Sequence, residues 1–130
     1  MTTLLDTSAL AKLVVVEKES APLRRFLKDA ASQGHRFYIS SLAVTELRRL
    51  VIRLGLDQTV AEPVLARFGV VRLGDGVLHL AGRLPYRHLG TLDAIHLATA
   101  LTIEASTVVT YDLRQAEAAR TEGLTVVTPM

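Results

Sequence analysis

The stretch TLLDTSALAKLV, residues 3–14, decides the fold class of this chain. Its first part, Thr3–Asp6, is a short β-favouring and apolar run that predicts a buried strand. The residues after it have apolar side chains at helical spacing, and we expect Thr7 or Ser8 to cap that helix. Because alternating strands and helices are typical of α/β proteins, the fold class depends on whether this unit recurs along the chain.

The strand–helix unit recurs to the end of the chain. Four further strands are predicted at Arg36–Ser40, Val70–Leu73, Thr107–Thr110 and Leu124–Thr128. Further helices are predicted at Glu19–Ser32, from a Ser41 cap to Gly55, at Asp57–Phe68, at Asp75–Leu84, from a Thr91 cap to Thr102, and at Leu113–Glu122. By the crossover rule, this order predicts a three-layer α/β/α sandwich with a central, mostly parallel five-stranded sheet. Ligands of such sheets bind beyond the carboxyl ends of the strands.

Two of the predicted helices have special features. Pro63 should kink or shorten the helix at Asp57–Phe68, because proline cannot continue the backbone hydrogen bonds. The segment LDAIHLATAL, residues 92–101, is apolar on nearly every face. We therefore expect it to be deeply packed.

Length and composition limit the classes of protein to consider. The 130 residues fit one domain, 1–130, and the absence of cysteine excludes disulfides and thiolate metal sites. Only oxygen and imidazole remain as metal ligands, which favours hard cations. The start of the chain has no basic region before an uninterrupted apolar run, and no later run approaches the length of a membrane helix. The sequence thus favours a soluble, cytoplasmic protein.

The basic residues are mostly arginine. Arginine accounts for 12 of the 15 basic residues, although the formal net charge is only +2. The planar guanidinium matches phosphate, but a genome rich in arginine codons explains the same bias equally well. The six aromatic residues are scattered, which argues against a base-stacking platform.

Nine of the 13 acidic residues have ordinary explanations as exposed polar-face residues or helix caps. They are Glu17, Glu19, Asp29, Glu62, Glu104, Glu117 and Glu122 on polar faces, and Asp57 and Asp75 as caps. The remaining four are Asp6, Glu46, Asp93 and Asp112. Each of the four follows a predicted strand or lies near the start of a predicted helix. Strand ends and helix starts meet at one edge of a parallel sheet, so these four carboxylates can converge there.

Each of these acids alone also has a structural interpretation. Asp6 and Asp112 are suited to cap the helices that follow them, Asp93 to favour a helix dipole, and Glu46 to pair with Arg49. Together the four acids indicate a metal site. Two carboxylates about 4 Å apart repel by roughly 4 kcal/mol at an effective dielectric of 20. A cluster is stable only with a cation, and Mg²⁺ and Mn²⁺ prefer oxygen ligands. Such ions support phosphodiester hydrolysis.

Four segments, in order, resemble the PIN-domain nucleases, and specifically the VapC toxins of bacterial and archaeal toxin–antitoxin pairs. The segments are LLDTSALAKL (4–13), SSLAVTELRRL (40–50), TLDAIHLATAL (91–101) and VVTYDLRQAEAA (108–119). The resemblance implies that Asp6, Glu46, Asp93 and Asp112 form the metal-binding quartet of an endoribonuclease that uses Mg²⁺ or Mn²⁺. It further implies cleavage of structured RNA such as tRNA or rRNA, a homodimer, and silencing by a VapB-type antitoxin.

The chain departs from the family pattern in two places. No further carboxylate follows Asp112 until Glu117, so a second metal site is incomplete, and Gly90 stands where many relatives carry a basic residue. Near the quartet, Ser8 and Thr110 are expected to hydrogen-bond the carboxylates or to act as caps. His96 is expected to be a satisfied core histidine rather than a proton carrier. Candidates for holding the RNA backbone are Arg48, Arg49, Arg53, Arg87 and Arg114.

Three other classes compete with this interpretation. A haloacid dehalogenase phosphatase needs a second Asp where this chain has Ser8, and a receiver domain needs a late lysine, whereas the last lysine here is Lys28. A PIN fold that only binds RNA or a protein partner is the remaining alternative. Retention of all four acids favours the nuclease.

Overall fold

Every strand of the central sheet runs parallel to its neighbours. The computed structural model describes all 130 residues, and its sheet has the strand order β3-β2-β1-β4-β5. The strands are β1 (Thr2–Leu5), β2 (Arg36–Ser40), β3 (Gly69–Val71), β4 (Thr107–Val109) and β5 (Thr125–Val127). The expected α/β sandwich is confirmed, and its sheet is entirely rather than mostly parallel.

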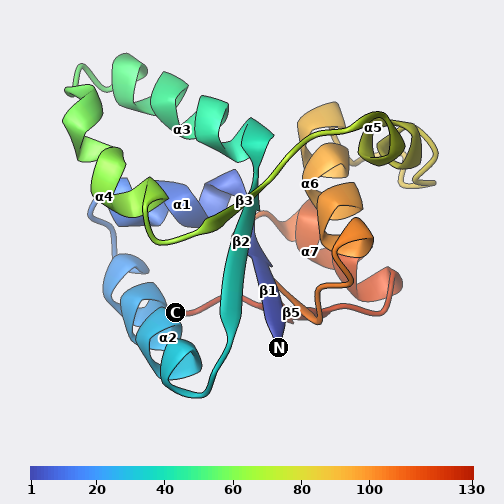
Figure 1. Cartoon of the computed structure of the whole chain (residues 1–130), viewed down its shortest axis with the longest axis horizontal. Helices are drawn as coiled ribbons and strands as arrows, with labels where there is room; N and C mark the ends of the chain where they lie inside the picture. The colour runs from blue at the N-terminus through green and yellow to red at the C-terminus, as the bar shows by residue number, and fades with distance from the viewer.

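Helices cover both faces of the sheet (Figure 1). One layer holds α1 (Thr7–Val14), α2 (Ser20–Ser32), α3 (Ser41–Arg53) and α4 (Glu62–Leu65), with a short 3₁₀ helix at Gln58–Val60. The other layer holds α5 (Asp75–Ala81), α6 (Thr91–Thr102) and α7 (Leu113–Thr121). Because helices cover both faces of the sheet, a ligand approaches it beyond the carboxyl ends of its strands.

The middle strand β1 shows why the sequence folds into layers. Leu4 and Leu5 are both fully buried, and they belong to different apolar clusters. Leu5 packs with side chains of α1–α4, whereas Leu4 packs with Leu97 of α6 and with alanines of α7. Because neighbouring side chains of a strand point to opposite faces, a short apolar run is enough to anchor both helical layers.

Three helix caps lie one residue earlier than the sequence predicts. Asp6, not Thr7 or Ser8, caps α1 by accepting a hydrogen bond from the Ala9 backbone N–H, so the capping role given above as an alternative for Asp6 is confirmed. Ser40, not Ser41, caps α3 in the same way, and Gly90, not Thr91, precedes α6 without a side-chain cap. The reason is that the capping residue keeps an extended backbone, so it belongs to the end of the preceding strand or loop.

Two predicted helices are shorter in the structure. The prediction at Asp57–Phe68 is wrong as one helix: Asp57 caps the short 3₁₀ helix, and Pro63 lies in the first turn of α4. Proline is tolerated there because the first N–H groups of a helix have no partner within it. The helix predicted from Asp75 to Leu84 ends at Ala81, and Gly74 rather than Asp75 is its N-cap. Other element ends differ from the prediction by one or two residues.

The membrane prediction can also be compared with the structure. None of the helices combines the length and the apolar character that crossing a bilayer requires.

Two valines provide a matched test of the packing on α3. Val51 is fully buried in the larger apolar cluster, whereas Val16 is 85% exposed in the loop after α1. We expect Val51→Ala to lower the free energy of unfolding by about 2 kcal/mol, because it removes two buried methyl groups and leaves a cavity. Val16→Ala should change it by less than about 0.5 kcal/mol. Urea unfolding of both variants measures the difference, and equal effects would contradict the described core.

Candidate active site

All four predicted acids lie at the carboxyl ends of the strands. Asp6 directly follows β1, and Asp112 follows the end of β4 and caps α7. Glu46 lies in the second turn of α3, which leaves the end of β2, and Asp93 lies in the first turn of α6. Figure 1 shows α3 and α6 on opposite sides of this end of the sheet. The fold therefore places the four side chains around one region.

Asp6 is held rigidly at the centre of this region. Its side chain is almost fully buried, with the whole residue 1% exposed. Oδ1 accepts hydrogen bonds from the Ser8 hydroxyl (2.6 Å) and the Ala9 N–H, and Oδ2 accepts one from the Thr110 hydroxyl (2.5 Å). Burial raises the pKa of Asp6 despite these hydrogen bonds. The expected contacts from Ser8 and Thr110 to a carboxylate are thus present.

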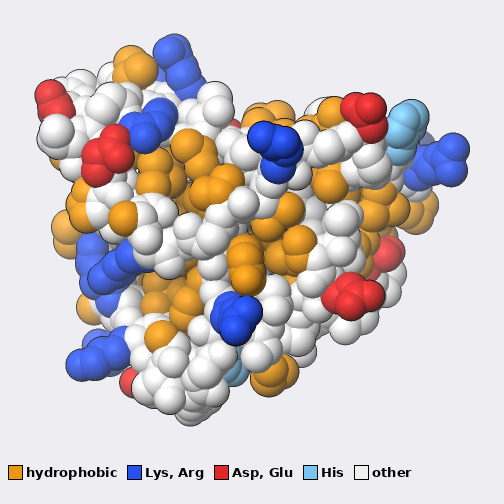
Figure 2. Space-filling model, in the orientation of Figure 1, with side chains coloured by type: hydrophobic (Ala, Val, Ile, Leu, Met, Phe, Trp, Pro, Cys, Tyr) orange, Lys and Arg blue, Asp and Glu red, His pale blue; other side chains and the backbone are white.

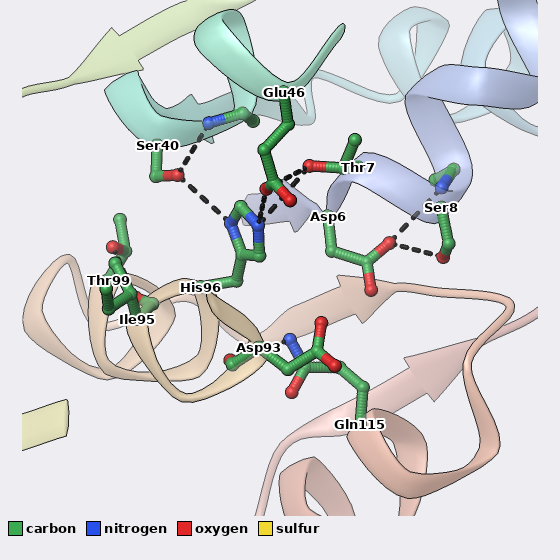
Figure 3. A network of polar contacts seen from close by, with 12 residues as sticks. Asp6, Thr7, Ser8, Ser40, Glu46, Asp93, Ile95, His96, Thr99 and Gln115 are labelled. Carbon is green, nitrogen blue, oxygen red and sulfur yellow. Dashed lines mark hydrogen bonds and ion pairs between the residues drawn. The ribbon is translucent and has the colours of Figure 1, made fainter. Parts of the chain in front are cut away.

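Glu46 is fixed by a chain of polar contacts that joins β2 and three helices (Figure 3). Its Oε1 accepts a hydrogen bond from the Thr7 hydroxyl (2.7 Å) and lies 2.6 Å from Nε2 of His96. Nδ1 of His96 lies 3.0 Å from the Ser40 hydroxyl. Partial burial alone would raise the pKa of Glu46, but the hydrogen bonds from His96 and Thr7 outweigh it and lower that pKa.

The contacts of Ser40 and Glu46 with His96 fit one arrangement of the ring hydrogens. The Ser40 oxygen accepts the Ala43 N–H, and its hydroxyl hydrogen can be donated to Nδ1 of His96. Nε2 then carries the ring proton and donates it to Glu46. His96 is 1% exposed, so the prediction of a satisfied core histidine is confirmed. The Glu46–Arg49 pair, the structural alternative for this acid, is not formed, because His96 and Thr7 hold the carboxylate instead.

Asp93 is the acid whose charge is least compensated. Its carboxylate accepts no hydrogen bond within the protein, and its side chain is turned toward the region of Asp6 in Figure 3. Burial raises the pKa of Asp93 to about 6, and the negative charges of Asp112, Asp6 and Glu46 add to this effect. The charges of the three other acids therefore act on Asp93 in the same direction as its burial.

Asp112 has a structural role as well. Its Oδ1 accepts the backbone N–H groups of Arg114 (2.9 Å) and Gln115 (3.1 Å), which caps α7. The Asp112 N–H in turn donates to the Thr110 hydroxyl, which donates to Asp6. Thr110 therefore links the two acids that end neighbouring strands.

The side chains of this region are of the type that binds a divalent cation, but their positions are not yet those of a metal site. All four candidate donors are carboxylates, the ligands that Mg²⁺ and Mn²⁺ prefer, and a cation would relieve the repulsion at Asp93. However, no three histidine or acidic side chains stand in an arrangement ready to hold one metal ion. Asp93 has no hydrogen bond to break, so it is the side chain most free to turn toward an ion.

The structure adds residues that the sequence alone did not assign. Thr7 and Ser40 hold Glu46 directly and through His96. The sequence predicts Thr7 as a candidate helix cap and assigns no role to Ser40. The sequence does not show which distant side chain either hydroxyl faces. Glu19 was expected on a solvated face, but it is 7% exposed and lies 3.0 Å from Lys12.

Comparisons with known proteins identify the family of this chain. The PIN domain family model matches residues 3–121. The chain is 41% identical over 128 residues to Ribonuclease VapC46 of Mycobacterium tuberculosis (strain ATCC 25618 / H37Rv), covering 96% of this chain and 95% of that protein. The chain therefore belongs to the PIN domain family. Within this family, its sequence is similar to the VapC ribonucleases.

Solved structures share the fold at low sequence identity. VapBC2 from Rickettsia felis, bound to a DNA fragment from their promoter, has a TM-score of 0.78 at 18% identity, with 98% of each chain covered. A toxin-antitoxin complex from Klebsiella pneumoniae has a TM-score of 0.71 at 23% identity, again with 98% of each chain covered. These similarities support the fold assignment along nearly the whole chain.

The raised pKa of Asp93 gives a pH-dependent prediction. A carboxyl whose pKa is higher in the folded than in the unfolded chain destabilises the fold when it ionises, and here that cost develops between about pH 4 and about pH 6. We expect Asp93→Asn to melt at a higher temperature than the parent at pH 7.5 in EDTA. The gain should shrink at pH 4.5. Thermal unfolding followed by circular dichroism at both pH values measures it.

The control for this measurement is Asp29→Asn, which removes a carboxylate from the exposed side of α2. It should change the melting temperature little at either pH. A lower melting temperature for Asp93→Asn at pH 7.5 would instead show that this carboxylate stabilises the fold.

Proposed function

We propose that this chain is a metal-dependent endoribonuclease and the toxin of a type II toxin–antitoxin pair. The observation that carries the proposal is the position of Asp6, Glu46, Asp93 and Asp112 at the carboxyl ends of the strands, in a chain of the PIN domain family. The similarity to Ribonuclease VapC46 supports RNA as the substrate. In this proposal residues 1–130 act as one PIN domain.

The four acids have different tasks in the proposed reaction. Asp6 and Glu46 are already oriented by hydrogen bonds, so they lose little side-chain freedom on binding a cation. Asp93 is free of hydrogen bonds and completes the site, and Asp112 adds negative charge from the start of α7. When bound, Mg²⁺ or Mn²⁺ would orient the phosphate, activate water and stabilise the leaving oxygen.

His96 acts through Glu46 rather than on the substrate. It is buried, and its two ring nitrogens are occupied by Ser40 and Glu46. The Nε2–H group keeps the Glu46 carboxylate ionised and directed away from α3, as a positioning residue does for a metal ligand.

Partners follow from the same proposal. We propose structured RNA, such as tRNA or rRNA, as the substrate class, and a VapB-type antitoxin and a second copy of this chain as protein partners. The Klebsiella pneumoniae neighbour is described as a toxin-antitoxin complex, which is consistent with this assignment.

Cleavage of RNA is the direct test. We expect the purified chain to degrade total RNA with Mg²⁺ or Mn²⁺ but not with EDTA. Asp6→Asn and Asp93→Asn should each lower the rate at least about a hundredfold, because each removes a charge from the site. Asp29→Asn, which removes a charge elsewhere, should cleave at the parental rate. Gel electrophoresis of the RNA over time measures all four proteins.

The inactive alternative makes a different prediction. A parent chain that binds RNA or a protein partner but never cleaves with either metal would favour a binding module of the PIN fold. Equal cleavage by the parent and Asp93→Asn would contradict the assigned site even if the chain is a nuclease.

Metal binding can be measured without turnover. At a Mn²⁺ concentration one hundred times its dissociation constant, binding to the folded chain should raise the free energy of unfolding by about 2.7 kcal/mol. Asp93→Asn should lose most of this increase, because it removes the least compensated donor. Thermal unfolding with and without Mn²⁺ tests this, and an equal increase for both proteins would place the ion elsewhere.

A further inference from the structure

A groove of about 590 Å³ lies beside Glu46. It runs along α3 and is bounded by the starts of α1 and α6. Its lining combines hydroxyl, apolar and charged side chains, including Thr7, Ser8, Leu42, Glu46, Arg49 and Arg53. Glu46 is the sole acidic residue of this lining, so the groove leads from the acid cluster onto a positively charged surface.

The two arginines lie on one face of α3 with Glu46. Arg49 and Arg53 follow Glu46 by three and seven residues, and residues at this spacing lie along one face of a helix. Arg49 and Arg53 are about 6 Å apart along the helix axis. Arg53 is close enough to Glu46 for its charge to lower the pKa of that carboxyl.

Neither arginine is used by the protein itself. Arg49 and Arg53 are exposed and form no ion pair or side-chain hydrogen bond. Arg48, on the adjacent face of the same helix, pairs with Glu62 at 3.0 Å and donates to Gln58. The chain thus provides a partner for one arginine of this helix and leaves the two in the groove available to a ligand.

Two other hollows with basic side chains are less suitable for an RNA backbone, because the RNA must also reach the four carboxylates. None of the four acids lines the hollow with Arg87 and Arg114, whose one acidic residue is Glu117. Basic side chains also gather over α2 and α4, at the left of Figure 2, where Arg24, Lys28 and Arg67 surround Leu27, Phe37 and Phe68. None of the four acids lines that hollow.

We propose that Arg49 and Arg53 bind successive backbone phosphates of the RNA next to the bond that is cut. This inference rests on the proposed ribonuclease function. Guanidinium groups match phosphate oxygens in a bidentate geometry, and two of them one helical turn apart suit a repeating anionic chain. The groove has no aromatic side chain, so it binds the backbone without stacking bases and adds little sequence preference.

The test measures RNA binding separately from cleavage. Arg49→Gln, Arg53→Gln and the double variant are made in the Asp6→Asn chain, and binding to a fluorescent 20-nucleotide RNA of mixed sequence is followed by anisotropy in EDTA. We expect the dissociation constant to rise about fivefold for each single variant. The slope of log affinity against log salt should become shallower by about 0.7 for each arginine removed. Arg48→Gln and Arg67→Gln, which remove equal charge outside the groove, should bind as the Asp6→Asn chain does.

Each outcome separates this inference from the proposed function. If all four single arginine variants lose affinity equally, the effect is general charge and the assignment of the groove is wrong. If Arg49→Gln and Arg53→Gln bind RNA normally but bind a VapB-type antitoxin more weakly than the Asp6→Asn chain does, the groove binds protein, which also overturns the inference. In both cases cleavage by the parent would still support the nuclease. A parent that neither binds nor cleaves RNA would overturn both.

Discussion

Repulsion between carboxylates at one edge of the sheet is the constraint on which the rest of this structure depends. Burial raises the pKa of Asp93, and the charges of Asp112, Asp6 and Glu46 raise it further. The protein compensates three of the four acids with its own donors: hydroxyls and an N–H for Asp6, Thr7 and His96 for Glu46, and helix N–H groups for Asp112. Asp93 receives none, so the remaining negative charge is concentrated on one side chain that a cation can neutralise.

The strand order explains how distant residues reach this edge. In the order β3-β2-β1-β4-β5, the chain moves outward from β1 to β3 and then returns to place β4 on the other side of β1. The crossover helices change layer between these two halves, which makes the boundary of β1 and β4 a topological switch point. Asp6 and Asp112 follow these two strands, and α3 and α6 flank them from opposite layers. A ligand site at this position is therefore a consequence of the topology.

The sequence predicted the sheet, its layers and the location of the acids, because these depend on local patterns. Leu4 and Leu5 identify a buried strand without knowledge of their partners, and an Asp after such a strand must lie at the carboxyl edge. The partners of Glu46 could not be predicted in this way. Arg49 is its neighbour on the helix, yet His96, fifty positions away, holds it. Local spacing favours the nearer partner, whereas packing of α3 against α6 decides which donor reaches the carboxylate.

The two roles of the acids affect how substitutions at this edge are interpreted. Asp6 caps α1 and accepts three hydrogen bonds, and Asp112 caps α7, so replacing either one loses stabilising contacts while it relieves repulsion. A lost cap costs about 1 kcal/mol, which offsets part of the gain from the relieved repulsion. Asp93 has no cap or hydrogen bond to lose at its carboxylate. A change in stability at Asp93 therefore reports the burial of its charge together with the repulsion from its neighbours, without a lost hydrogen bond, whereas a change at Asp6 or Asp112 also includes lost contacts.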